Sequence, residues 1–209
     1  MAGFFITVEG PDGTGKSTQV KLLGQYLKER GHEVLLTREP GGTSLAEKIR
    51  SILLDPGSAG IAPETEALLY AAARAQHVAE VIAPALASGK IVLSDRFIDS
   101  TIVYQGIGRG LAAGDIAAIN SFATGGIKPD LTIVLDLEPE EGLARLASRC
   151  NGQEGFDRME QESVEFYRKV REGYLALARQ EERIKVISAK GTVEKVQERI
   201  IEILKQTGL

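Results

Sequence analysis

The sequence predicts an α/β fold, in which a five-stranded parallel sheet carries helices on both faces. Short apolar segments, mostly rich in β-branched residues, alternate along the chain with longer amphipathic segments, which is the pattern of strand–helix–strand units. The segments expected to form strands are Phe4–Glu9, Val34–Arg38, Ile91–Asp95, Leu131–Asp136 and Ile184–Ser188. Because open parallel sheets bind ligands outside the carboxyl ends of their strands, we expect the functional residues at those ends.

The spacing of apolar residues predicts three prominent helices. The first covers residues 16–30 and ends at Gly31. The second is long and alanine-rich, over residues 64–88, where Pro84 should kink or end it. The last follows Thr192, a plausible N-cap, and its apolar stripe consists of Val193, Val196, Ile200, Ile203 and Leu204.

The composition indicates one globular domain that spans residues 1–209. The chain is 43% hydrophobic and 26% charged, which excludes a disordered protein, and no linker or repeat divides it. Its net charge of −4 disfavours a nucleic-acid polymer as partner, and no apolar run approaches the ~20 residues that cross a membrane. Cys150 is the one cysteine, so a reducing compartment is expected. Since the N-terminal segment also lacks the basic residues of a signal peptide, the predicted location is the cytoplasm.

The loop after the first expected strand predicts a site for nucleotide phosphates. Residues 10–17 match the motif G-x-x-x-x-G-K-[ST] in full, between a strand and a helix, which is the context that this motif requires. Its glycines let successive N–H groups point at phosphate oxygens, in front of the positive end of a helix dipole. Lys16 is expected to bridge the β- and γ-phosphates and the Ser17 hydroxyl to bind Mg²⁺. The predicted ATP-binding residues are Gly10, Pro11, Asp12, Gly13, Thr14, Gly15, Lys16, Ser17 and Thr18.

Several classes of protein use such a loop, and other segments discriminate between them. A GTPase needs an Asn-Lys-x-Asp element for guanine, which this chain lacks, and motor or transporter ATPases usually have larger domains. A small kinase needs a second pocket with positive charges for the phosphate of its acceptor. Arg38 and Arg96, each beside a carboxylate at a strand end, are suited to hold that phosphate, and Asp95 is suited to orient Mg²⁺.

Five segments, in order along nearly the whole chain, resemble the thymidylate kinase family. They are the phosphate-binding loop, "REPGGT" (38–43), "LLYAAARAQH" (68–77), "DRFIDSTIVYQG" (95–106) and "DRMEQES" (157–163). The resemblance implies a P-loop kinase fold and transfer of the γ-phosphate of ATP to dTMP with Mg²⁺, giving dTDP for dTTP biosynthesis. It also implies a homodimer, with the 64–88 helix in the interface.

The resemblance assigns roles to individual residues of the acceptor site. Asp12 would approach the 3′-hydroxyl of the deoxyribose, Tyr70 would stack on the base and Arg74 would hydrogen-bond a thymine carbonyl. Tyr104 would lie against the sugar and disfavour a 2′-hydroxyl. The full set of implied substrate-binding residues is Asp12, Arg38, Glu39, Pro40, Tyr70, Arg74, Arg96, Ser100, Thr101, Tyr104 and Gln105, with a cis bond expected before Pro40.

A lid over the ATP phosphates is implied for residues 144–160. The phosphate-binding loop contains no arginine, which favours the subgroup of the family whose catalytic arginine lies in the lid. Arg149 is the first candidate, and Arg145 and Arg158 are alternatives, although Arg158 could instead pair with Glu162 four residues on. The implied catalytic residues are Lys16, Asp95, Arg96 and Arg149, and the implied metal ligands are Ser17 and Asp95.

Two other functions remain open at the level of sequence. One is a kinase that phosphorylates another nucleotide or a deoxynucleoside. The other is a regulator that binds a nucleotide as a switch and transfers no phosphate.

Overall fold

In a computed structural model, which describes residues 3–149 and 155–209, the chain forms the predicted five-stranded sheet. Every neighbouring pair of strands is parallel, in the order β2-β3-β1-β4-β5, which confirms the α/β fold class. The strands have the bounds predicted from the sequence: β1 (Phe4–Glu9), β2 (Val34–Arg38), β3 (Ile91–Asp95), β4 (Leu131–Asp136) and β5 (Ile184–Ser188).

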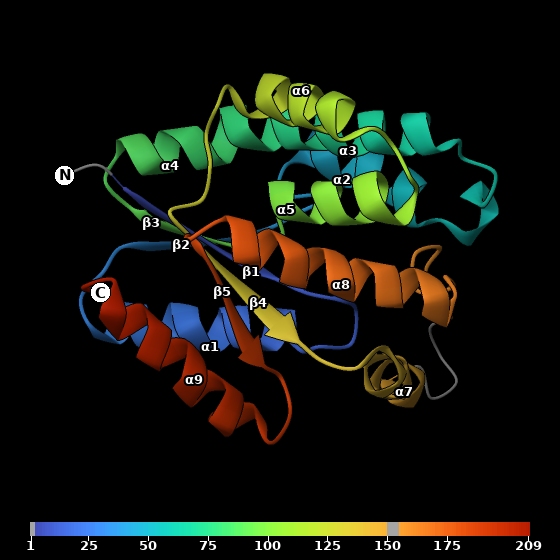
Figure 1. The fold of residues 1–209 in the computed structure, drawn as a ribbon. Coiled ribbons are helices and arrows are strands. Elements are labelled where there is room, and N and C mark those ends of the chain that lie inside the picture. Colours follow the sequence, from blue (N-terminus) through green and yellow to red (C-terminus); the bar gives the residue numbers. More distant parts are fainter. Residues whose placement is uncertain (1–2, 150–154) are drawn as a thin grey trace.

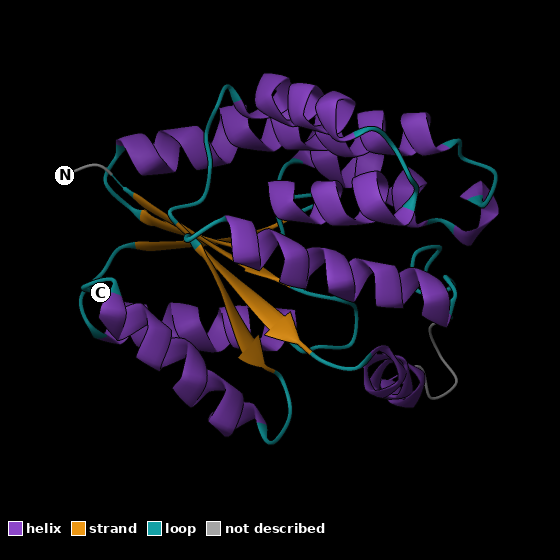
Figure 2. Cartoon of the chain, in the orientation of Figure 1, coloured by secondary structure: helices purple, strands orange, loops and turns teal. Residues whose placement is uncertain are grey.

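Helices cover both faces of the sheet, as predicted (Figures 1 and 2). On one face lie α1 (Lys16–Glu29) and α9 (Val193–Gln206), whose N-cap Thr192 accepts a hydrogen bond from the amide of Lys195. The helices of the other face are α2 (Ser44–Leu54), α3 (Pro63–His77), α4 (Ala83–Ala87), α5 (Ile98–Thr101), α6 (Ala113–Thr124) and α8 (Val164–Gln180). Beyond the end of β4 lies α7 (Pro139–Arg149).

The three central strands, β1, β3 and β4, are buried on both faces, and β1 illustrates how alternate side chains enter two cores. Ile6 and Val8 of β1 pack in one cluster with apolar residues of α1 and α9. Phe5, the residue before Ile6, packs on the opposite face with Phe97, at 4.8 Å between ring centroids. This two-sided burial accounts for the uninterrupted apolar runs in the sequence.

The predicted 64–88 helix is divided by a π-helical segment, Val78–Ile82, which separates α3 from α4. Pro84 lies in the first turn of α4 and has no N–H to donate to the preceding turn. Here the amide of Ala83 donates to the carbonyl of Val78, five residues back, so the backbone widens one turn before the proline. A second π-helical segment, Ile102–Gly108, follows α5.

The strand register gathers the predicted site at one edge of the sheet. Asp95 of β3 is opposite both Arg38 of β2 and Val8 of β1, and the phosphate-binding loop begins one residue after the end of β1. Within the described residues, no helix is both long enough and apolar enough to cross a membrane.

Candidate active site

The phosphate-binding loop connects β1 to α1 with its backbone folded around the Lys16 side chain. The Nζ of Lys16 donates to the carbonyl of Pro11 at 2.8 Å, and the Oγ1 of Thr14 donates to the same oxygen at 2.8 Å. Gly15 precedes α1 with a φ of 92°, a conformation that glycine adopts without steric cost. Lys16 is 7% exposed, and burial, followed by the charge of Arg96, lowers the pKa of its ammonium to about 8.

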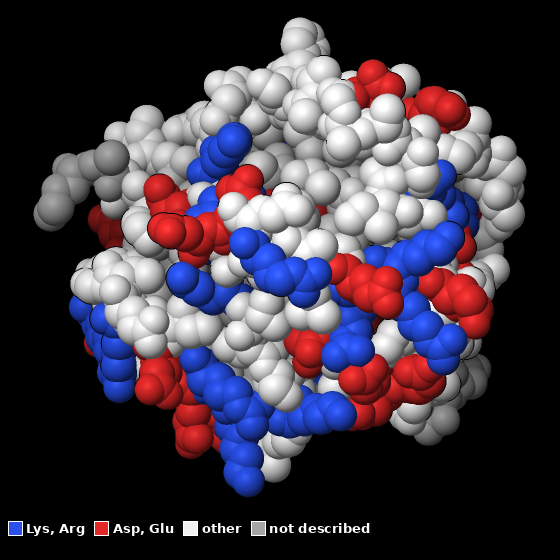
Figure 3. Space-filling model, viewed as in Figure 1, with Lys and Arg blue, Asp and Glu red and all other residues white. Residues whose placement is uncertain are grey.

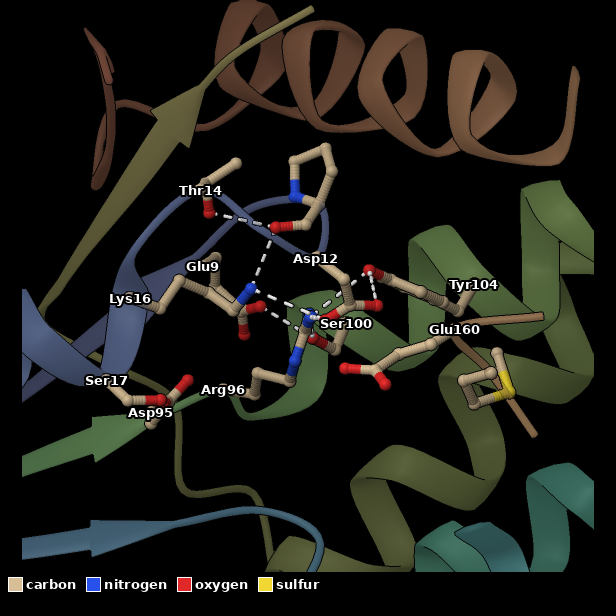
Figure 4. Close-up of polar contacts among 12 residues, drawn as sticks. Glu9, Asp12, Thr14, Lys16, Ser17, Asp95, Arg96, Ser100, Tyr104 and Glu160 are labelled. Atoms are coloured by element: carbon tan, nitrogen blue, oxygen red, sulfur yellow. Dashed lines mark hydrogen bonds and ion pairs between the residues drawn. The ribbon is translucent and has the colours of Figure 1, made fainter. Parts of the chain in front are cut away.

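Ser17 and Asp95 form a pair of oxygen ligands beside this lysine. The Oγ of Ser17, in the first turn of α1, donates to Oδ2 of Asp95 at 2.5 Å (Figure 4). A hydroxyl and a carboxylate are the hard ligands that Mg²⁺ prefers, and Mg²⁺ commonly takes only one or two protein oxygens beside nucleotide phosphates. The two residues predicted to bind a metal therefore lie together and fit it chemically.

Asp12 is surrounded by hydrogen-bond donors from distant parts of the chain. Its Oδ1 accepts from Nη2 of Arg96 at 2.5 Å, and its Oδ2 lies 3.2 Å from the hydroxyl oxygen of Tyr104 (Figure 4). The hydroxyl oxygen of Tyr167 also lies 3.2 Å from Oδ2. Burial alone would raise the pKa of this carboxyl, but the charges of Arg96 and Lys16 outweigh it and lower the pKa to about 2. Asp12 is therefore an anion at neutral pH.

Arg96 has an unusual backbone conformation, held by a buried carboxylate. Its φ is 71°, in the left-handed region that non-glycine residues rarely adopt. Directly after it, the amide of Phe97 donates to Oε1 of Glu9 at 2.7 Å, and Ser100 Oγ donates to the other oxygen of Glu9 at 2.6 Å while it accepts from Nη1 of Arg96 at 3.0 Å. Burial, with Asp99 nearby, raises the pKa of Glu9 to about 7. Glu9 thus fixes both the backbone and the side chain of Arg96.

The predicted acceptor-side residues, except Arg38, line a single cavity of about 100 Å³. The peptide bond between Glu39 and Pro40 is cis, as predicted. The predicted residues in the lining are Asp12, Glu39, Pro40, Tyr70, Arg74, Arg96, Ser100, Thr101, Tyr104 and Gln105. Arg50, Leu54, Phe97, Asp157 and Met159 complete it and were not predicted.

Arg74 is 2% exposed, and most of its donors are used within the chain. Nε donates to Glu39 at 2.8 Å, and Nη1 donates to Thr101 at 2.9 Å and to Asn120 at 2.7 Å. Nη2 donates to the Phe97 carbonyl at 3.0 Å. A guanidinium has five N–H groups, so one N–H of Nη2 remains for a molecule in the cavity.

Glu66 lies on the same face of α3 as Arg74 and orients Gln105, which lines the cavity. It is 1% exposed, and it accepts from Nε2 of Gln105 at 2.8 Å, from Arg109 at 3.1 Å and from Arg158 at 2.6 Å. Because the amide nitrogen of Gln105 donates to Glu66, its carbonyl oxygen is free to act as an acceptor toward the cavity. Buried His77 bonds Glu39 and Thr37, a structural role.

Arg38 lies apart from the other acceptor-side residues. Its Nη2 lies 2.9 Å from both carboxylate oxygens of Glu47 in α2, and its side chain is 52% exposed. Arg50 instead reaches the acceptor cavity from α2, with Nη1 2.8 Å from the carbonyl of Pro40. Arg50 could have been found from the sequence only by noting that it lies about two turns into the helix after the cis proline.

A second cavity, of about 400 Å³, adjoins the first on the side of the phosphate-binding loop. Gly13, Gly15, Lys16, Ser17 and Thr18 line it, together with Arg38, Asp95 and Arg145. The two cavities share the residues Asp12, Glu39, Arg50, Arg96 and Asp157. Gly10, Pro11 and Thr14 shape the loop without lining either cavity.

The three arginines considered for the lid differ in position. Arg145 of α7 lines the larger cavity and donates to the carbonyl of Ala189 at 3.2 Å. Arg158 is 7% exposed and donates to Glu66 and to the carbonyl of Leu53, so the predicted pair with Glu162 is wrong. Glu162 pairs with Arg109 instead, at 2.6 Å. The side chain of Arg149 lies outside the described part of the structure.

Comparisons with known proteins agree on one family. The family model described as thymidylate kinase matches residues 8–200. A thymidylate kinase of Geobacter sulfurreducens is 54% identical over 205 residues, covering 97% of this chain and 96% of that protein. One from Lactobacillus delbrueckii subsp. bulgaricus is 48% identical over 209 residues, covering 99% and 98%. The crystal structure of thymidylate kinase from Ehrlichia chaffeensis superposes with a TM-score of 0.78 at 36% identity, covering 98% of this chain and 99% of that one.

Proposed function

The chain belongs to the thymidylate kinase family and phosphorylates dTMP to dTDP, and we propose that ATP occupies the larger cavity while dTMP occupies the smaller one. One observation carries this assignment: the two cavities meet at Asp12, Arg50 and Arg96. A donor and an acceptor phosphate that entered from opposite sides would meet at two arginines, which suit phosphate through their planar, multiply donating guanidinium groups.

The proposed ATP site is the loop of residues 10–18. Its N–H groups and the start of α1 hold the phosphates, Lys16 supplies a fixed cation, and Ser17 with Asp95 holds Mg²⁺. When bound, the metal supplies charge that stabilises the transferring phosphoryl group. Phosphoryl transfer depends mainly on positioning and electrostatics, so these residues need not form any covalent intermediate.

The proposed thymine site uses the groups that the chain leaves unsatisfied in the smaller cavity. The remaining N–H of Arg74 would donate to a ring carbonyl, and the carbonyl oxygen of Gln105 would accept from the ring N–H. Tyr70 would stack on the base, and Tyr104, whose hydroxyl is held by Arg96 and Asp12, would lie against the sugar. Asp12 would accept from the 3′-hydroxyl, and Arg96 and Arg50, with Arg38 at the entrance, would hold the acceptor phosphate.

The proposed catalytic arginine of the lid is Arg149, at the end of α7. Arg158 is poorly placed for this role, because its guanidinium donates to the carbonyl of Leu53 and to Glu66. Arg145 lines the larger cavity and is the remaining alternative.

We also propose a homodimer in the cytoplasm, formed through the packed helices α2, α3 and α6. Phe122 of α6 is 91% exposed, and the neighbouring helices expose Leu45, Ile52 and Leu68. Few charged side chains lie over α6 in the view of Figure 3, whereas they crowd the surface below it. Such an uncharged face suits contact with a second copy, and measurement of the molar mass in solution tests it.

The proposed substrates are tested by incubation of the protein with Mg-ATP and each nucleoside monophosphate in turn. We expect dTMP to be phosphorylated with the highest kcat/KM. Equal or faster transfer to another monophosphate would refute the acceptor assignment, and tight nucleotide binding without any transfer would favour a regulator.

A further inference from the structure

Tyr167 is a buried residue of the active site that no sequence motif indicates. It lies in the first turn of α8, is 1% exposed, and places its hydroxyl oxygen 3.2 Å from Oδ2 of Asp12. The same oxygen lies 3.0 Å from the carbonyl oxygen of Met159. The Asp12 carboxylate and the Met159 carbonyl are both acceptors, whereas the hydroxyl of Tyr167 has one proton to donate. Tyr167 therefore shares this proton between the phosphate-binding loop and the segment before α8.

The carboxylate of Asp12 depends on this hydroxyl for its orientation. Its Oδ1 is held strongly by Arg96, whereas its Oδ2 has only the two tyrosine hydroxyls as donors among the described residues. Tyr104 is itself tied to the guanidinium of Arg96, at 3.2 Å. Without Tyr167, the remaining donors to Asp12 in the described part of the chain are Arg96, Tyr104 and, at 3.7 Å, Lys16, and the carboxylate would turn toward them.

Met159 connects the same hydroxyl to the wall of the acceptor cavity. Its side chain lines that cavity, and its amide donates to Asp157 at 2.9 Å. The neighbouring Arg158 fastens this segment to the carbonyl of Leu53 at 2.7 Å. Tyr167 therefore contacts, through one oxygen atom, both Asp12 and Met159, two residues that line the acceptor cavity.

We propose that Tyr167 is a positioning residue that holds the Asp12 carboxylate toward the 3′-hydroxyl of the acceptor, and so sets the preference of the enzyme for acceptors that carry this hydroxyl. The proposal rests on the proposed role of Asp12 toward the sugar. The Tyr167 ring packs edge-on against Phe166, with ring centroids 6.0 Å apart. Tyr167→Phe keeps that ring and removes only the hydroxyl, so folding should be retained.

The test compares dTMP with its 3′-deoxy analogue as acceptors for the wild-type protein, Tyr167→Phe and the control Tyr26→Phe. Tyr26 of α1 packs against the apolar cluster between the sheet, α1 and α9, and it does not line either cavity. Its hydroxyl has no hydrogen-bond partner in the described part of the chain. The wild-type ratio of kcat/KM for the two acceptors should fall about 3- to 10-fold in Tyr167→Phe, the range for one hydrogen bond. KM for ATP and the melting temperature should change little, and Tyr26→Phe should keep the wild-type ratio.

A double-mutant comparison tests whether Tyr167 acts through Asp12 and not through a general loss of activity. In the background Asp12→Asn, the further change Tyr167→Phe should alter the ratio less than it does in the wild-type protein, because the two residues act through one contact. Additive effects, or an unchanged ratio in Tyr167→Phe, would overturn the role of Tyr167 alone. A wild-type protein that phosphorylates dTMP without preferring it to the 3′-deoxy analogue would overturn both this role and that of Asp12. Failure to phosphorylate dTMP would instead refute the proposed function itself.

Discussion

Gly13 contacts α7 so closely that an added methyl group tests how this helix rests on the phosphate-binding loop. A Cβ atom at Gly13 would lie 2.1 Å from the carbonyl oxygen of Gly142, and a Cβ atom at Gly142 would lie 2.7 Å from the carbonyl oxygen of Asp12. Two glycines therefore let the backbones of loop and helix touch. Gly13→Ala would force them apart by most of an ångström.

The size of the effect follows from two costs. Gly13 has a φ of 80°, and an alanine in this left-handed conformation costs about 1–2 kcal/mol. Forcing extra atoms into a packed contact adds about 1–3 kcal/mol. Gly31 supplies the matched control, because its φ is 85° and nothing lies within 4 Å of its added Cβ. We expect Gly31→Ala to show only the first cost and Gly13→Ala to show both.

Urea unfolding and steady-state kinetics would measure these effects on the same preparations. Gly13→Ala should lower the free energy of unfolding by about 2–5 kcal/mol and Gly31→Ala by about 1–2 kcal/mol. Only Gly13→Ala should reduce kcat, by up to about 100-fold, because displacement of reacting groups by about 1 Å is enough for such a loss. If the two variants matched in stability and in kcat, the contact with Gly142 would not support the loop.

Three further predictions concern charged residues. Because burial and Asp99 raise the pKa of Glu9 to about 7, the native chain binds a proton that the unfolded chain releases above pH ~4.5. Stability should therefore fall by about 3 kcal/mol as the pH rises from about 4.5 to 7, and urea unfolding across this range should show no such fall in Glu9→Gln. Lys16→Ala should abolish nearly all turnover, since the γ-phosphate loses its fixed cation, and a near-normal kcat would refute that role. Arg149→Ala should lower kcat far more than it weakens ATP binding measured by calorimetry, whereas a loss confined to Arg145→Ala would move the catalytic role there.

The sequence predicted the strands to the residue because the sheet is parallel and its central strands are buried on both faces. Such strands are continuous apolar runs, and a charged residue marks the end of β1, β2, β3 and β4. The long helix was harder, since its interruption at Val78–Ile82 contains ordinary helix-forming residues. Pro84 indicated an interruption of the helix, but the residues Val78–Ile82 do not indicate that it takes the form of a π-helical segment.

The sequence could indicate which segments meet at the site, but not which side chains pair with one another. Two of the acceptor-side motifs follow β2 and β3, so the topology brings them to the same edge of the sheet. The partners of Arg38 and Arg158, Glu47 and Glu66, depend on how the helices pack. Tyr167 carries no motif and reaches Asp12 across 155 residues of sequence, so nothing short of the fold could identify it.

The groups proposed to hold phosphate all have hydrogen-bond partners within the chain. These partners limit how much the phosphates can contribute to substrate affinity. Arg96 bonds Asp12, Lys16 bonds the carbonyl of Pro11, and Ser17 bonds Asp95. When a phosphate binds, each of these groups exchanges an oxygen atom of the protein for an oxygen atom of the phosphate. Without the phosphate the buried cations keep their protein partners, and this avoids the cost of several kcal/mol for an unpaired buried charge. The net gain for each such exchange is small, so affinity must arise from groups that have spare capacity, above all the N–H of Arg74 and the carbonyl of Gln105. Since those two groups are the ones proposed to contact the base, recognition of the acceptor should depend more on its base than on its phosphate.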